Sequence, residues 1–197
     1  MKHLIILCLL TIGLLPLTTQ AQTISREELV FLTSQWEGER FPDGRPRVPD
    51  AILERMKNVT IEEAWGVIRE EGFHNQFEGG WKMIHADRIV VGRALTVQYL
   101  PNRPDVSQPL LEHGHAEGRI GATNSWPIDM LQVGDVYVAD GFGKVDGGTL
   151  IGDNLGNAIY TNSKNGVIFD GSLRDLEGLE AIDGFNAFVR DWHPSYI

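Results

Sequence analysis

The clearest pattern in the chain lies between residues 133 and 171. It opens with Val133-Gly134-Asp135-Val136-Tyr137-Val138-Ala139-Asp140-Gly141 and closes with Gly166-Val167-Ile168-Phe169-Asp170-Gly171. Each run is short and apolar and ends in an acid and a glycine, which is typical of a buried strand followed by a turn. A helical pattern from about Asn154 to Lys164 separates them. A strand, a helix and a strand with short links predict a parallel crossover, and hence an α/β fold.

Another strand is predicted upstream of this unit. Residues 89–99 read Ile-Val-Val-Gly-Arg-Ala-Leu-Thr-Val-Gln-Tyr and are followed by Pro101. The run is rich in β-branched residues and is bounded by a residue that disfavours continuation of a sheet. We expect one bent strand or a pair of strands here.

The part of the chain before this strand is helical in pattern. A stretch rich in proline and glycine, residues 36–46, interrupts the pattern between Thr23 and Arg69. We therefore expect a helix on each side of it, the second beginning near Asp50. A further helix should begin after Thr60, because the Glu that follows three residues later can complete a capping box.

The first residues have the features of a secretory signal. Met-Lys-His is followed by an apolar run from Leu4 to Leu17 and by small residues up to Ala21. The run is short for a membrane span, so a retained anchor is the less favoured alternative. We predict that residues 1–21 are removed and that the protein is secreted or periplasmic, with no membrane attachment after cleavage. Because Cys8 is the only cysteine, the mature chain has no thiol, which excludes disulfides and thiolate zinc sites.

Composition limits the functions that are open to the chain. The 197 residues are 42% hydrophobic and 22% charged, which is typical of a soluble globular protein and not of a disordered or fibrous one. Asp and Glu number 27 against 17 Lys and Arg, and the formal net charge is −10. Binding to duplex nucleic acid needs clustered positive charge, so we expect no nucleic-acid partner. An anionic substrate stays open if a local cation offsets the negative charge.

Two short elements carry candidate chemistry. One is the helix start Gly152-Asp153-Asn154-Leu155, whose free N–H groups could bind a carboxylate or phosphate. The other is Arg174-Asp175 after the second strand, which combines a planar fork for carboxylates with a hard oxygen ligand for a divalent cation. Each alone is explained better by a helix cap or a surface ion pair. A crossover places both at one edge of the sheet, where they could bind a metal ion and an α-keto acid.

The same residues give a resemblance to a known family. Asp153 followed by the Arg174-Asp175 pair resembles the RraA-like family, which includes 4-hydroxy-4-methyl-2-oxoglutarate aldolases. Residues 91–97, Val-Gly-Arg-Ala-Leu-Thr-Val, look like an early strand of that family, and residues 133–141 look like its Pro-Gly-Asp-Val strand. The resemblance extends over roughly residues 88–190.

The resemblance implies a fold and a domain organisation. It implies a swivelling β/β/α domain over residues 88–197, preceded by an N-terminal helical extension over residues 22–87. Relatives continue beyond the point that corresponds to Ile197, which leaves open that the domain is incomplete at its C-terminus. Relatives form trimers or hexamers, so a homo-oligomer is expected.

The resemblance also implies an activity. It predicts a divalent-metal-dependent lyase that cleaves a small α-keto carboxylic acid to pyruvate, by retro-aldol cleavage or by decarboxylation. By analogy, Asp175 would bind Mg²⁺, Mn²⁺ or another divalent cation, Arg174 would be catalytic and bind substrate, and Asp153 would act through metal-bound water. The remaining substrate-binding residues would be Gly152, Asn154 and Leu155. Family members that regulate a ribonuclease without catalysis give the alternative of a binding or regulatory module.

Three other interpretations are weaker. His113 and His115, with Glu112 and Glu117, could bind zinc, but residues two apart alternate across a strand or lie in a loop, and no second half of a zinc motif follows. Ser172 lacks the sequence context of a hydrolase nucleophile. A methyltransferase would need a glycine motif that the chain does not contain.

Overall fold

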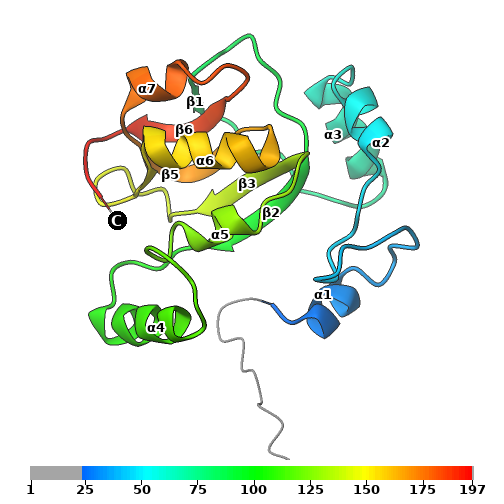
Figure 1. Ribbon diagram of the computed structural model, residues 1–197. Helices are drawn as coiled ribbons and strands as arrows, with labels where there is room; N and C mark the ends of the chain where they lie inside the picture. Colours follow the sequence, from blue (N-terminus) through cyan, green and yellow to red (C-terminus); the bar gives the residue numbers. More distant parts are fainter. Residues whose placement is uncertain (1–23, 197) are drawn as a thin grey trace, which may run out of the picture. The chain divides into compact units, whose positions relative to one another are not determined.

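The computed structural model describes residues 24–196 (Figure 1). The predicted secretory signal lies outside this range. The chain divides into two compact units, Met1–Arg47 and Val48–Ile197, and each is described by itself. Within the described range, no helix is both long and apolar enough to cross a membrane.

The first unit contains helix α1, Arg26–Leu32, and the loop that follows it. Ser25 caps the helix, because its hydroxyl accepts a hydrogen bond from the Glu28 amide at 3.1 Å. In the loop, the Arg40 guanidinium donates to the Thr33 hydroxyl at 2.7 Å and to the Gly44 carbonyl at 2.9 Å. These bonds hold the predicted break between helices in a fixed turn.

The second unit begins with α2, Asp50–Met56, and α3, Ile61–Glu70. The capping box predicted at Thr60 is present: its hydroxyl accepts from the Glu63 amide at 3.2 Å, and its own amide donates to the Glu63 carboxylate at 2.9 Å. Both predicted helix starts are confirmed.

A six-stranded sheet forms the centre of the second unit, in the order β1-β6-β5-β3-β2, with β4 paired to β5. The pairs β2/β3, β3/β5, β4/β5 and β5/β6 are parallel, and β1/β6 is antiparallel. The strands are β1 Lys82–Met83, β2 Arg93–Gln98, β3 Asp135–Asp140, β4 Thr149–Ile151, β5 Val167–Leu173 and β6 Ala187–Trp192.

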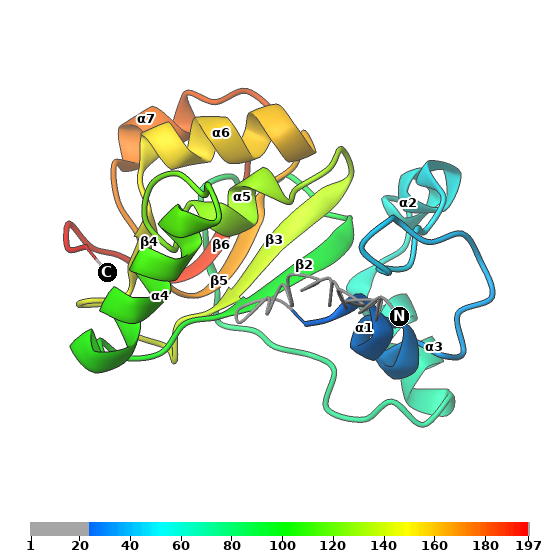
Figure 2. The same ribbon diagram turned by 60° about the horizontal axis from the view of Figure 1, so that its bottom comes forward.

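Three helices cover one face of this sheet. They are α5 Trp126–Asp129, α6 Asp153–Ser163 and α7 Leu176–Glu180, whereas α4 Pro104–Ala116 lies before them in the chain. Figures 1 and 2 both show α5, α6 and α7 on the same side of the sheet. The core between the layers includes Tyr137, Ile159 and Phe169, which are fully buried. Burial of this apolar face is the main stabilising contribution to the layer.

A tyrosine pair lies within the core. The hydroxyls of Tyr99 and Tyr137 are 2.5 Å apart, and the Tyr137 ring contacts Phe169 edge to face. Burial raises the pKa of Tyr99 to about 12, against a smaller lowering by its hydrogen bond to Tyr137. Burial also raises the pKa of Tyr137, as do the charge and the hydrogen bond of Tyr99. Both side chains are therefore held neutral.

The predicted α/β class and parallel crossover are confirmed. The strand expected over residues 89–99 is a single strand, β2, and is shorter than predicted because its register with β3 runs from Arg93 to Gln98. The short strand β4 was not predicted. It enters the crossover directly before α6 and pairs with the last residues of β5.

Candidate functional site

The predicted helix start and strand end lie at the same edge of the sheet. β4 ends at Ile151, which pairs in register with Leu173 at the end of β5. The Arg174 amide donates to the Ile151 carbonyl at 3.1 Å. Since α6 begins two residues after β4 ends, its first residue, Asp153, lies next to the Arg174-Asp175 pair along this edge.

Gly152 lets the Asp175 carboxylate lie against the start of α6. A Cβ atom at Gly152 would lie 2.1 Å from Asp175 Oδ2 and 3.2 Å from Arg174 Nε. The backbone of Gly152 is extended, with φ of −119°, so the conformation itself does not require glycine. The absence of a side chain is required because the carboxylate of Asp175 occupies that space.

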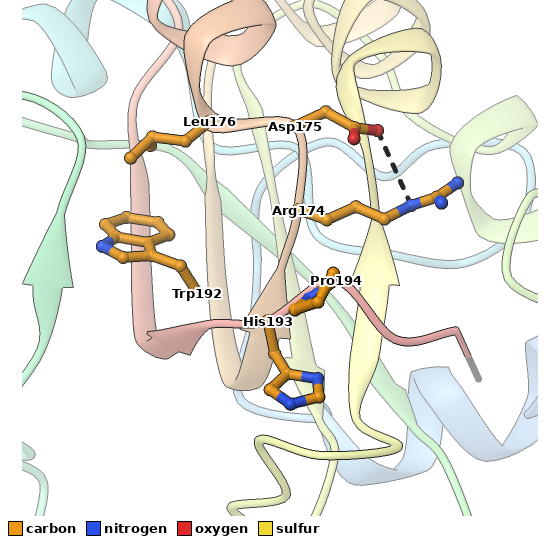
Figure 3. Close-up of a pocket in the computed structure, with 6 residues that line it drawn as sticks. All are labelled: Arg174, Asp175, Leu176, Trp192, His193 and Pro194. Carbon is orange, nitrogen blue, oxygen red and sulfur yellow. Dashed lines mark ion pairs between the residues drawn. The ribbon is translucent and has the colours of Figure 1, made fainter.

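The Arg174-Asp175 pair follows β5 in a tight turn. Asp175 has φ of +59°, a left-handed conformation in which Asp is one of the more tolerated residues. Arg174 Nε lies 3.6 Å from Asp175 Oδ2, and the two side chains are 33% and 44% exposed. Figure 3 shows both side chains extending to the same side of the strand end. The pair is thus accessible to a ligand and is not a buried ion pair.

Asp153 faces the helix that follows β5. Its Oδ1 accepts a hydrogen bond from the Asn154 amide at 2.7 Å. A Cβ at Gly178 in α7 would lie 2.7 Å from Asp153 Oδ2, so this carboxylate also lies against a glycine. The Asn154 amide is engaged and its side chain is exposed, while Leu155 packs partly against the core.

A pocket of about 330 Å³ opens beside the pair (Figure 3). Its lining consists of Arg174, Asp175, Leu176, Trp192, His193 and Pro194. Trp192 is the last residue of β6, and His193 and Pro194 follow it; β6 runs parallel to β5 with Trp192 opposite Leu173. Our sequence analysis did not select these C-terminal residues. The signal that could have found them is the apolar stretch of β6 ending in Trp-His-Pro, since parallel strands end at one edge.

Hydrogen bonds of two hydroxyl groups hold the segment after β6 against the sheet. Thr149 Oγ1 lies 2.9 Å from Ser195 Oγ and donates to the His193 carbonyl at 3.0 Å. Ser195 Oγ also accepts from the Gly147 amide at 3.0 Å. These bonds place the Tyr196 ring over the Arg174 guanidinium, 4.3 Å from the guanidinium carbon to the ring centre. One face of the guanidinium is therefore covered by an aromatic ring.

The imidazole ring of His193 is oriented by a residue of the same C-terminal segment. The Ser195 amide donates to His193 Nδ1 at 3.2 Å, and Asp146 Oδ1 lies 3.8 Å from the same nitrogen. In Figure 3 the ring points away from the Arg174-Asp175 pair.

Two other acids close the strand motifs noted in the sequence. Asp140 and Asp170 are opposite each other in β3 and β5. Asp140 accepts from the Phe142 amide at 2.8 Å, and Asp170 forms an ion pair with Arg190. Hydrogen bonds to Asp170 and then to Glu78 raise the pKa of Arg190. Both acids have partners of their own and lie outside the residues that line the pocket.

The zinc alternative at His113 and His115 rested on a wrong placement. Both residues lie in the last turn of α4, not in a strand or loop. His113 Nε2 lies 3.3 Å from Glu117, its neighbour one turn on, and His115 Nε2 bonds the Gly121 carbonyl at 2.9 Å. Across residues 24–196, no three His, Cys, Asp or Glu side chains form a group that could hold a metal ion.

Solved structures with a similar fold include three that overlap most of the chain. An unusual member of the RNase ES inhibitor RraA family, RraAS2 from Streptomyces coelicolor, is 23% identical, with a TM-score of 0.61 over 76% of this chain and 68% of that one. An uncharacterized protein from Pseudomonas syringae pv. tomato is 19% identical, with a TM-score of 0.59 over 76% of this chain and 60% of that one. A chain described among novel cellulases from gut-associated microbes is 20% identical, with a TM-score of 0.60 over 88% of this chain and 70% of that one. At these identities the likeness shows the fold alone.

The family of the chain is shown by comparison of its sequence with family models. No curated protein gives a significant match to the sequence. Residues 58–196 match the model of the RraA-like family, described as Aldolase/RraA, and this range begins inside the predicted N-terminal extension and contains the whole sheet. With most of its length matched and the predicted motifs at one edge of an α/β sheet, the chain belongs to the RraA-like family.

Proposed function

We propose that the protein is a divalent-metal-dependent lyase that releases pyruvate from an α-keto carboxylic acid by retro-aldol cleavage or decarboxylation. The observation that carries this proposal is that Arg174 and Asp175 line the pocket and that Gly152, at the start of α6, lies against both of them. Such a site would combine a guanidinium that can bind a substrate carboxylate, an exposed carboxylate that can bind a metal ion, and the start of helix α6.

Arg174 is the residue that would bind and orient the substrate. Its guanidinium has one face on Tyr196, which leaves the N–H groups in the plane of the fork for hydrogen bonds to a carboxylate. The partial positive charge at the start of α6 adds to the attraction. Because the Asn154 amide already donates to Asp153, a ligand at this helix start would use the amides beside it.

The residues present fit a divalent cation at Asp175. The carboxylate is exposed and lies in space that a side chain at Gly152 would fill. Mg²⁺ is commonly held by one or two carboxylates and several waters, so a three-residue cluster is not needed. When bound, such a cation supplies Lewis-acid stabilisation of the charge that develops on the keto oxygen.

The proton balance sets what the chain's own groups must do. In retro-aldol cleavage the hydroxyl at C4 loses its proton, the C3–C4 bond breaks, and C3 of the resulting pyruvate enolate is protonated. Asp153 is the acid nearest the start of α6, and its Oδ1 is oriented by the Asn154 amide. We propose that Asp153 orients the water molecule that accepts the proton from the C4 hydroxyl and returns it to C3.

The alternative is a binding or regulatory module without turnover. RraAS2 from Streptomyces coelicolor is described as an unusual member of a ribonuclease-inhibitor family, which supports such a role in a protein of this fold.

The test is a pyruvate-release assay on a set of α-keto acids, with and without chelator. We expect turnover that the chelator removes and a divalent cation restores. Asp175→Ala should abolish metal-dependent turnover, and Arg174→Lys should lose most of it because an ammonium group lacks the bidentate fork. Normal rates in Asp175→Ala, or turnover that ignores the chelator, would replace this proposal with the binding module.

Two further parts of the proposal concern location and assembly. Export follows from the signal pattern of residues 1–21, and mass spectrometry of the native protein should find a chain that starts near Gln22. Homo-oligomers of three or six copies should be seen by light scattering. An intact Met1 would contradict the proposed export, and a monomer would contradict the proposed assembly. Neither result would affect the proposed chemistry.

A further inference from the structure

The pocket next to Arg174 has a polar side and an apolar side. Arg174 and Asp175 form the polar side, and Leu176, Trp192 and Pro194 supply apolar surface. Figure 3 shows the Leu176 side chain on the same side as the Trp192 indole, with Pro194 next to His193 and below Arg174 in this view. A ligand whose carboxylate binds Arg174 would therefore present its remaining part to an aliphatic and aromatic wall.

The charges around the pocket do not provide for a second carboxylate. Among the six lining residues, all within the described range, Arg174 is the one with a permanent positive charge. The imidazole of His193 accepts a hydrogen bond from the Ser195 amide and points away from the Arg174-Asp175 pair. The cation proposed at Asp175 would be taken up by the keto-acid end of the ligand, and the neighbouring Glu177 is exposed. A second carboxylate would therefore have no cation of its own among the lining residues.

We infer that the preferred ligand is an α-keto monocarboxylate with an apolar, aromatic substituent, and not an α-keto dicarboxylate. The inference rests on the proposed function, since it takes Arg174 as the carboxylate-binding residue. The volume of about 330 Å³ lies at the lower end of the range for small-ligand pockets, so it is suited to a single ring and a short acid chain. The flat indole of Trp192 offers a surface on which such a ring can pack.

Binding of two unreactive probes tests the ligand class directly. We would measure phenylpyruvate and 2-oxoglutarate by calorimetry on the full mature chain with Mg²⁺ present. Phenylpyruvate should bind at least about tenfold more tightly, because its ring gains apolar contact where the second carboxylate of 2-oxoglutarate loses hydration. Equal affinities, a reversed order, or no binding of either probe at millimolar concentration would overturn the inference.

A positive charge introduced into the apolar wall should reduce the difference in affinity between phenylpyruvate and 2-oxoglutarate. Pro194 is exposed, so Pro194→Arg tests the wall without disturbing the core. It should reduce the preference for phenylpyruvate about tenfold by giving 2-oxoglutarate a partner for its second carboxylate. Ile120→Arg is the matched control, because Ile120 is 83% exposed and does not line the pocket. An equal effect of both variants would contradict the proposed location.

Turnover separates this inference from the proposed function. Retro-aldol cleavage of 4-hydroxy-2-oxo-4-phenylbutanoate gives pyruvate and benzaldehyde, and that of 4-hydroxy-4-methyl-2-oxoglutarate gives two molecules of pyruvate. Faster cleavage of the phenyl compound supports both proposals. Faster cleavage of the dicarboxylate keeps the lyase and overturns the ligand class. Cleavage of neither, with tight phenylpyruvate binding, overturns the lyase and keeps the ligand class.

Discussion

Gly152→Ala should damage the proposed site while leaving the fold almost intact. The new methyl carbon would lie 2.1 Å from Asp175 Oδ2. Since non-bonded contacts lie near 3.5 Å, the carboxylate would have to move by about 1 Å or more. The backbone at Gly152 is already in a conformation that alanine adopts, so the contact with Asp175 is the source of the effect.

The effect on stability should be small. The Asp175 side chain is 44% exposed and can turn toward solvent, at a cost of about 0.5–1.5 kcal/mol for an unfavourable rotamer. In a chain of this size that corresponds to a fall of a few degrees in Tm. In an Asp175→Ala background the contact no longer exists, so the same substitution should cost almost nothing there.

The effect on turnover should be large. A displacement of about 1 Å in a positioned catalytic group can lower the rate about a hundredfold, which is about 2.7 kcal/mol in activation free energy. The assay is kcat/KM for pyruvate release, together with urea denaturation of the single and double variants.

Gly66→Ala is the matched control. A Cβ at Gly66 in α3 would have no neighbouring atom within 4 Å. Alanine should therefore stabilise the helix by about 0.5–1 kcal/mol and leave turnover unchanged. The reasoning is refuted if Gly152→Ala turns over at the parental rate, or if its destabilisation is the same when Asp175 is alanine.

Three further outcomes follow from individual contacts in the structure. Tyr196→Ala should raise KM about two- to fivefold by removing an exposed cation–π contact with Arg174, and Tyr196→Phe should restore it; unchanged KM in both would remove the positioning role. Asn186→Ala should lower the unfolding free energy by about 2–4 kcal/mol in urea, because this buried amide holds the backbone of residues 85–88. The contribution of neutral Tyr99 to the unfolding free energy should be constant up to about pH 10 and should fall as the pH rises toward 12, because its raised pKa makes the unfolded state lose the proton first. Tyr99→Phe should reduce that fall in alkaline denaturation curves.

Several features were determined by the sequence itself because they depend on local chemistry. The start of α3 follows from a Thr and a Glu three residues apart, which satisfy each other's backbone groups. Strands β3 and β5 follow from continuous apolar runs, since strands buried on both faces have no polar alternation. The meeting of Asp153 with the Arg174-Asp175 pair follows from the direction of a parallel crossover.

Other features required the tertiary structure. Strand β4 has three residues, too few for a periodic signal, and is stabilised by its partner β5. Helix α4, which carries His113 and His115, was not predicted. It contains Pro109 and Gly114, residues that disfavour a helix interior, and Trp126 packs in the space above Gly114. Local pattern cannot show that a distant aromatic ring fills such a gap.

The candidate site shows the same division. Its chemistry at Arg174 and Asp175 could be selected from residue types and spacing. Its walls could not, because Trp192 and Tyr196 reach it through the pairing of β6 with β5 and the hydrogen bonds of Ser195 with Gly147 and Thr149. The sequence determines which groups can act on a ligand, and the packing of distant segments decides which ligand fits, because those contacts exist only once the sheet has formed.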